Sequence, residues 1–126
     1  MKYILLISTL MFSAGSWAEW TVVAESSRTG ARTYVDFDRI RKVNGLVYYW
    51  QLRDYLEPNK HGVMSTKLYH KADCETMREW ELSFTAYKLP MAEGTGETLP
   101  PDPDPKWDYA QPDSILEGTL QAVCAH

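Results

Sequence analysis

The sequence contains few of the side chains that metal sites and catalytic sites use most. Its 126 residues include only two cysteines and three histidines. Cys74 and Cys124 belong to no C-x-x-C pair, and we expect no histidine to complete a zinc site beside them. His61, His70 and His126 stand at no recognisable spacing from a nucleophile and an acidic partner. The sequence therefore predicts a protein that is not an enzyme, with no metal site and no cofactor.

Long hydrophobic runs are also missing. The apolar stretch Tyr3–Phe12 is too short to span a bilayer, which takes about 20 residues. Lys2 precedes it and small residues follow it, a pattern typical of a secretory signal peptide. We predict that residues 1–18 are cleaved off and that residues 19–126 form one mature domain. Because residues 1–18 contain no cysteine that could accept a lipid, we expect an exported protein, periplasmic, secreted or at the cell surface, with no direct membrane anchor.

Basic residues are too few to suggest a nucleic acid or an anionic lipid as the main partner. Lys and Arg number 13 against 17 Asp and Glu, for a formal net charge of -4. Three of the carboxylates, Asp102, Asp104 and Asp108, lie close together, but they lack the glycine turn and closing glutamate of a calcium loop. We expect this segment to be a solvated acidic loop.

In an exported chain, two cysteines predict one disulfide, Cys74–Cys124. Closing a loop of about 50 residues would restrict the unfolded chain by roughly 4 kcal/mol. The two cysteines also bracket a segment rich in proline and glycine, 90–105, which predicts a long surface loop inside the domain.

The remaining pattern predicts strands first and a helix last. Alternation of apolar and polar residues indicates strands at 20–25, 32–37, 46–56, 63–72 and 78–88, with one helical turn at 38–41. Ser114 and Glu117 fit a capping box before an apolar stripe that includes Cys124. Short connections favour a meander. The predicted fold class is α+β: an antiparallel, strongly curled meander of about five to six strands with a C-terminal helix tethered by the disulfide.

The long strands offer a candidate protein-binding face, because Tyr and Arg are enriched in recognition hot spots. Strand parity places five such residues on one face, opposite Trp50, Leu82 and Phe84. They are Tyr49, Arg53, Tyr55, Tyr69 and Tyr87. The alternative is that this face is simply the other side of the sheet, covered by the long loop or by a second copy of the chain in a homodimer.

Several short motifs occur in a characteristic order between Trp20 and Cys124. They are Tyr34-Val35-Asp36 followed by Asp38 and Ile40, Ser65, Cys74 followed by Arg78, Trp107, Pro112-x-Ser114 and Val123-Cys124. In this order and spacing the chain resembles the surface-adhesin protein E family of Gram-negative bacteria. The resemblance implies an antiparallel sheet with a disulfide-tied C-terminal helix.

The resemblance also implies a function in binding other proteins. The best-known member of the family is an outer-membrane adhesin that contacts host matrix and serum proteins such as vitronectin and laminin. The expected function is therefore a non-enzymatic binding protein at the cell envelope, with a host-matrix or serum protein as partner. The alternative is a soluble periplasmic structural or accessory protein that binds a small ligand such as haem through His61 or His70.

Overall fold

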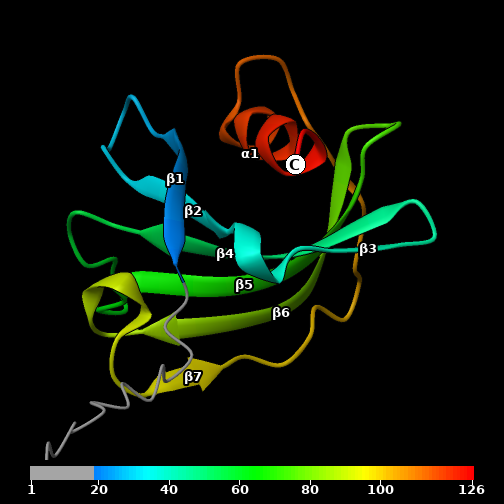
Figure 1. Ribbon diagram of the computed structural model, residues 1–126. Helices are drawn as coiled ribbons and strands as arrows, with labels where there is room; N and C mark the ends of the chain where they lie inside the picture. The colour runs from blue at the N-terminus through cyan, green and yellow to red at the C-terminus, as the bar shows by residue number, and fades with distance from the viewer. Residues whose placement is uncertain (1–18) are drawn as a thin grey trace, which may run out of the picture.

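Residues 19–126 are described by the computed structural model, in which strands precede a single C-terminal helix (Figure 1). The predicted signal peptide lies outside the described residues. The strands are β1 (Trp20–Glu25), β2 (Arg32–Asp36), β3 (Arg41–Val43), β4 (Leu46–Asp54), β5 (Ser65–Asp73), β6 (Arg78–Tyr87), β7 (Gly96–Thr98) and β8 (Asp108–Tyr109). Two 3-10 turns, η1 (Phe37–Arg39) and η2 (Pro90–Ala92), interrupt them, and α1 (Ile115–Cys124) ends the fold.

All eight strands join one antiparallel sheet, in the order β1-β2-β4-β5-β6-β7. β3 pairs with β4, beside β2, and β8 pairs with β6, beside β7. The predicted meander of five to six strands is thus too small. The prediction of a strongly curled sheet is also wrong, because the sheet stays open, with β1 and β7 as separate edges (Figure 1).

The strands that the sequence did not predict are all short. β3 and β4 form a hairpin whose two-residue turn, Asn44-Gly45, has positive φ angles of 51° and 80°, the conformation that Asn-Gly favours. β7 lies within the segment 90–105, which was expected to contain no regular element, and it pairs with the end of β6. Strands of two or three residues are too short to show a period, so only their turns or their neighbours reveal them.

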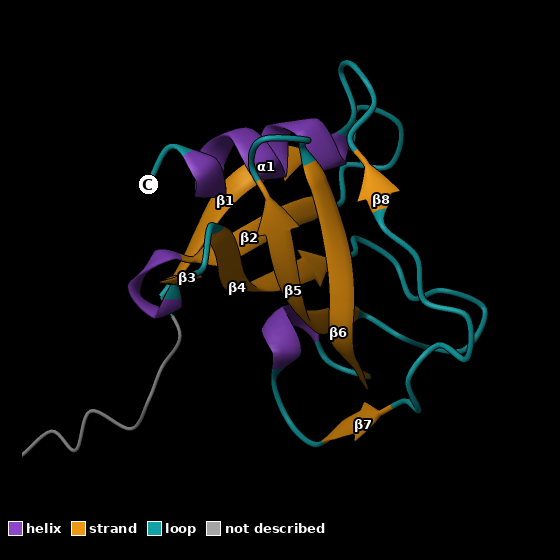
Figure 2. Ribbon diagram, turned by 90° about the vertical axis from the view of Figure 1, so that its right-hand side faces the viewer, coloured by secondary structure: helices purple, strands orange, loops and turns teal. Residues whose placement is uncertain are grey.

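α1 forms where the capping box predicts it. The Glu117 N–H donates to the Ser114 side chain at 3.1 Å, and the Glu117 carboxylate accepts from the Asp113 N–H. One face of α1 packs across the sheet (Figure 2). Leu120 and Val123 on that face are fully buried and share the core with four residues of the sheet, namely Val35, Val47, Tyr49 and Ala72.

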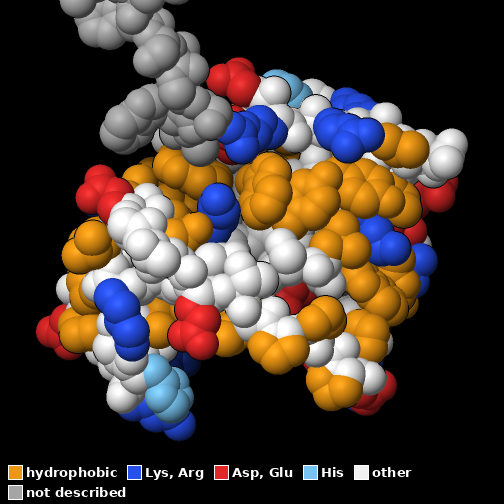
Figure 3. Space-filling model, turned by 90° about the horizontal axis from the view of Figure 1, so that it is seen from below, with side chains coloured by type: hydrophobic (Ala, Val, Ile, Leu, Met, Phe, Trp, Pro, Cys, Tyr) orange, Lys and Arg blue, Asp and Glu red, His pale blue; other side chains and the backbone are white. Residues whose placement is uncertain are grey.

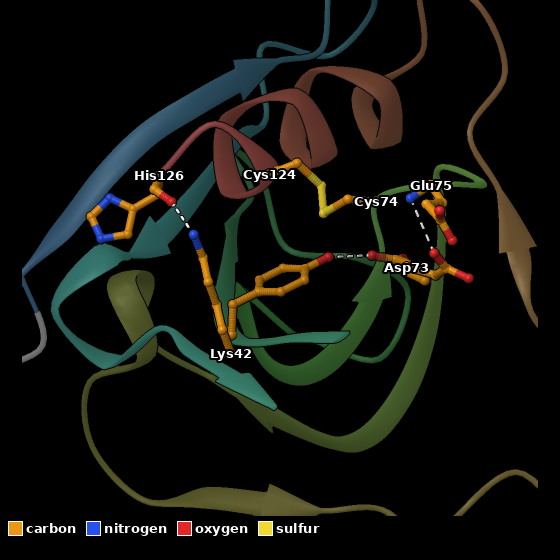
Figure 4. Close-up of a disulfide and its surroundings, with 8 residues drawn as sticks. Lys42, Asp73, Cys74, Glu75, Cys124 and His126 are labelled. Carbon is orange, nitrogen blue, oxygen red and sulfur yellow. Dashed lines mark hydrogen bonds between the residues drawn. A yellow bond between two sulfur atoms is a disulfide. The ribbon is translucent and has the colours of Figure 1, made fainter. Parts of the chain in front are cut away.

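The predicted disulfide joins the last turn of α1 to the end of β5 (Figure 4). The Cα atoms of Cys74 and Cys124 lie 5.8 Å apart. Beyond the disulfide, the Lys42 ammonium donates to the carbonyl of His126, and the His126 ring lies against Phe37. The C-terminus is therefore held to the sheet by both covalent and polar contacts.

A bulge divides β6 between the two faces of the sheet. Tyr69 pairs with Ser83 but His70 pairs with Glu81, so Leu82 has no partner on β5. Residues directly opposite one another share a face. Trp80, paired with Lys71, therefore lies on the face away from α1, and Phe84 lies on the face under α1. The regular alternation predicted for 78–88 therefore breaks at Leu82. We call the face under α1 the helix face and the opposite one the open face.

Candidate functional site

The five residues predicted as one binding face do not lie together. Tyr49, Arg53 and Tyr55 lie on the helix face, whereas Tyr69 and Tyr87 lie on the open face. Tyr49 is 0 % exposed, with its ring in the core under α1. The prediction that these five residues share one face is therefore wrong. It fails because Tyr69 pairs with Trp50, which places Trp50 on the same face as Tyr69 rather than opposite it.

The open face instead carries a row of aromatic side chains, which we call the aromatic strip: Tyr48, Trp50, Tyr69, Trp80 and Trp107. The Trp50 and Tyr69 ring centroids lie 4.6 Å apart, and Tyr48 lies 6.1 Å from Tyr69. Trp107, which immediately precedes β8, meets Trp80 edge to face at 5.4 Å. All five are half-buried rather than covered.

Basic side chains lie over these rings. The Lys67 ammonium is 5.1 Å from the Trp50 centroid, and the Lys71 ammonium is 5.3 Å from that of Trp80. The Arg78 guanidinium is 4.0 Å from the Trp107 ring, close enough for stacking. Figure 3, which looks onto the open face, shows hydrophobic side chains gathered over the sheet with lysine and arginine side chains among them. A chain of net negative charge thus carries a basic and aromatic surface at this place.

η2 limits the aromatic strip at one end. The Ser65 hydroxyl donates to the Leu89 carbonyl and accepts from the Ala92 N–H, and the Asp54 carboxylate accepts from the Met91 N–H. These contacts fasten η2 over the ends of β4 and β5, where Leu52 is fully buried. The remaining part of the open face stays accessible, and α1 cannot reach it.

The sequence contained one signal for the aromatic strip that parity alone missed. Trp50 lies on β4 and Tyr69 lies on the neighbouring strand β5. The aromatics at these positions alternate with buried residues on β4, so both faces of that strand are apolar. A strand with two apolar faces needs two partners, and residues 19–126 contain only one α-helix to cover it.

The histidines lie in two different settings. His70 is 1 % exposed and packs against the Tyr49 ring, with its Nδ1 atom 3.3 Å from a Glu79 carboxylate oxygen. The Tyr49 hydroxyl donates to the same oxygen at 2.6 Å. Burial lowers the pKa of His70 to about 3 and raises the pKa of Glu79. His61, in contrast, is exposed in the β4–β5 loop beside a cavity of about 620 Å³ that Phe84 and Leu99 also line.

Within residues 19–126 no three His, Cys, Asp or Glu side chains come together in a way that could hold a metal ion. Among the same residues, no helix is long and apolar enough to cross a membrane.

Comparison with known proteins gives a family match and several similar structures. Residues 20–125 match the surface-adhesin protein E family. The fold is similar to crystal structures of Haemophilus influenzae protein E. The selenomethionine form has 17% sequence identity and a TM-score of 0.61, covering 81% of this chain and 84% of that chain. Crystal form II has 19% identity and a TM-score of 0.59, covering 74% of this chain and 80% of that chain.

A third structure, protein E from non-typeable Haemophilus influenzae, is 18% identical with a TM-score of 0.57, covering 82% of this chain and 75% of that chain. No curated protein sequence matches the chain. The solved structures support the shared fold, and the family match extends over almost all of residues 19–126. The chain belongs to the surface-adhesin protein E family.

Proposed function

We propose that the protein is an exported, non-enzymatic adhesin-like protein that binds another protein through the aromatic strip on its open face. The observation that carries the proposal is a set of half-buried tryptophan and tyrosine rings with lysine and arginine over them, on a face that α1 does not cover. Trp, Tyr and Arg are the residues that dominate binding energy in protein interfaces. Membership of a family of surface adhesins supports protein binding and an exported location.

The chemistry of the strip favours a partner with an acidic segment. Lys67, Lys71 and Arg78 lie over the rings. Of the three, only Arg78 forms an ion pair within residues 19–126, with Asp73. A partner carboxylate would pair with the ammonium groups while its apolar side chains contact the exposed parts of the rings. Host-matrix and serum proteins with acidic segments are the partner class that we expect.

A binding measurement on the mature chain tests the proposal. Residues 19–126 are immobilised, and vitronectin and laminin are passed over the surface at low and at moderate salt. Trp50→Ala and the charge reversal Lys71→Glu should each weaken binding about tenfold or more. Binding should also weaken with salt, because exposed ion pairs are screened.

Matched controls lie elsewhere on the same chain. Tyr55→Ala removes an aromatic ring from the helix face, and Lys60→Glu reverses an exposed charge in the β4–β5 loop. Both should bind like the wild type. If Trp50→Ala and Lys71→Glu bind as well as these controls, the aromatic strip is not the site. If neither host protein binds at all, the host-matrix partner is wrong.

A soluble periplasmic accessory protein with a small ligand is the second candidate. It is supported by the cavity of about 620 Å³ that His61, Phe84 and Leu99 line. Fractionation of cells distinguishes the two candidates, since a chain found only in the periplasm cannot contact host proteins. For haem as the ligand, His61→Ala should abolish any Soret shift seen with the wild type.

A further inference from the structure

The outer side of β6 is paired at both of its ends and free in its middle. β8 pairs with Arg78 and Glu79, and β7 pairs with residues 85–87. Between them, no strand within residues 19–126 pairs with residues 80–83 on this side. At about 3.3 Å per residue, the free stretch is about 10 Å long. It therefore offers main-chain donors and acceptors that no strand of the described chain uses.

The proline content of the segment between β7 and β8 explains why the chain does not close this gap itself. Its four prolines have no N–H to donate to a neighbouring strand. The segment leaves β6 after β7 and returns to it at β8 (Figure 2). A cavity of about 280 Å³ lies between this segment and β6, and we call it the edge slot. Its walls are residues 80–84 on β6 and, on the other side, residues 98–102 and Pro105.

Two exposed leucines line the edge slot. Leu82 occupies the bulge of β6, so it has no partner on β5 either, and it is 38 % exposed. Leu99, on the other wall, is 42 % exposed. An extended segment that added to this edge would cover both leucines and pair with the free main chain of β6. Extended peptides bind exposed sheet edges in this way.

Carboxylates gather beside the edge slot. A second cavity of about 400 Å³ adjoins it, because Glu81, Asp102 and Pro105 line both. The charged residues of this second cavity are Glu81, Asp102, Asp104, Lys106 and Asp108. Lys106 already pairs with Asp104 at 3.1 Å.

The pKa of Glu81 reflects this excess of negative charge. Burial raises the pKa of Glu81 above its ordinary value. The nearby charges of Asp102 and Asp108 raise this pKa further, whereas Arg53 on β4 lowers it. A segment with a lysine or an arginine would relieve the repulsion among the carboxylates, and an acidic segment would increase it.

We propose that the edge slot binds a short, extended and basic segment of a partner protein. The segment would add to the free stretch of β6 by main-chain hydrogen bonds and place a lysine or arginine against Glu81 and Asp102. Charges at a sheet edge also discourage unwanted pairing, so carboxylates here would admit basic segments and reject acidic ones. The edge slot shares only Trp80 with the aromatic strip, has the opposite charge and does not depend on binding at the strip.

A peptide titration on the mature chain tests the proposal. The probe is acetyl-Lys-Val-Lys-Val-Lys-amide, and its control is the same peptide with glutamate at each lysine position. The basic peptide should bind saturably, and the acidic peptide should bind about tenfold or more weakly at low salt. Absence of binding by the basic peptide, or equal binding by the acidic one, overturns the proposal.

Methylation of the peptide N–H groups distinguishes strand addition from attraction between charges alone. Two versions of the basic peptide carry methyl groups on one or the other alternate set of N–H groups. Only one set faces the neighbouring strand in a ladder. One version should therefore lose about tenfold or more in affinity, and the other should bind like the unmethylated peptide. Equal affinity of the two versions overturns strand addition.

Changes in the protein locate the binding. Asp102→Asn, in an exposed segment, should weaken binding of the basic peptide about threefold at low salt. Glu57→Gln in the β4–β5 loop is the matched control, because Glu57 is also exposed but lines neither cavity. The peptide should slow hydrogen exchange in residues 80–83 but not in β1, an edge of the same sheet. Equal affinity of the two variants, or protection of β1 instead, overturns the assignment. Trp50→Ala should bind the peptide like the wild type, so the edge slot and the aromatic strip fail separately.

Discussion

At the scale of single residues, the least expected feature is the buried group formed by Tyr49, His70 and Glu79. Residues with acidic and basic side chains are seldom buried without a cause. Here the Tyr49 hydroxyl donates to a Glu79 carboxylate oxygen, and His70 Nδ1 lies 3.3 Å from the same oxygen without a hydrogen bond. The helix face thus contains a polar interior, and the ionisation of His70 and Glu79 contributes to how stability varies with pH.

The pKa of His70 predicts a loss of stability in mild acid. The unfolded chain takes up a proton on this histidine below about pH 6.5, whereas the folded chain does not until about pH 3. The free energy of unfolding should therefore fall as pH decreases through this window, by up to about 1.4 kcal/mol per pH unit from His70 alone. Urea denaturation of the wild type and of His70→Gln, repeated between pH 7 and pH 4.5, measures the difference.

Glu79 acts in the opposite direction. Its pKa is raised in the folded state, so the folded chain takes up this proton first and gains stability as pH falls toward 4.5. Replacing Glu79 with Gln should therefore make the free energy of unfolding fall more steeply as pH decreases. A constant difference between wild type and His70→Gln across the pH range would show that His70 does not stay neutral in the fold.

At this same scale, sequence reasoning located the disulfide but not the binding residues. Cys74 and Cys124 could be paired because an exported chain with two cysteines has one combination. The face on which a tyrosine lies depends instead on strand register, and counting alternate residues assigns the wrong face beyond a bulge. Tyr69 and Trp50 lie on one face because they are directly opposite in the β4–β5 ladder, which a single sequence does not reveal.

At the scale of the elements, α1 is short and contains a glycine that its packing does not require. A Cβ atom at Gly118 would meet the Ala24 Cβ and the Val23 carbonyl at 3.7 Å, an ordinary contact distance. Gly118→Ala should therefore raise the free energy of unfolding by up to about 1 kcal/mol, because glycine is a poor helix former. Chemical denaturation of the wild type and of Gly118→Ala measures this change in the free energy of unfolding.

Gly118→Leu is the matched contrast, since the larger side chain would collide with β1. It should destabilise the protein where alanine stabilises it. A loss of stability in Gly118→Ala would mean that the spacing between α1 and β1 is tighter than an alanine allows.

The long strands and the helix were predictable, and the small elements were not. Five alternating segments gave β1, β2, β4, β5 and β6 within one or two residues at most of their ends. Ser114 marked the start of α1 because its side chain satisfies a helix N–H that has no other partner. β7 and β8 contain three and two residues, and their pairing with β6 is a tertiary event that no local pattern encodes.

At the scale of the whole molecule, the disulfide connects α1 to the end of β5. It joins residues 50 positions apart and fixes α1, whose ten residues would be marginal alone in water. The double variant Cys74→Ser, Cys124→Ser should unfold more easily by about 4 kcal/mol. Denaturation of the reduced wild type should give the same loss, and a loss under about 1 kcal/mol would show that packing of α1 alone holds the helix.

The bulge at Leu82 has a consequence for how this sequence can change over time. Deleting that one residue would leave Glu81 opposite His70 and Ser83 opposite Tyr69, so β6 would alternate regularly and every side chain would keep its face. Trp80 would remain on the open face and Glu79 on the helix face. A deletion elsewhere in β6 would instead shift the register of the residues beyond it, so related sequences that lose one residue from this strand should lose it at the bulge.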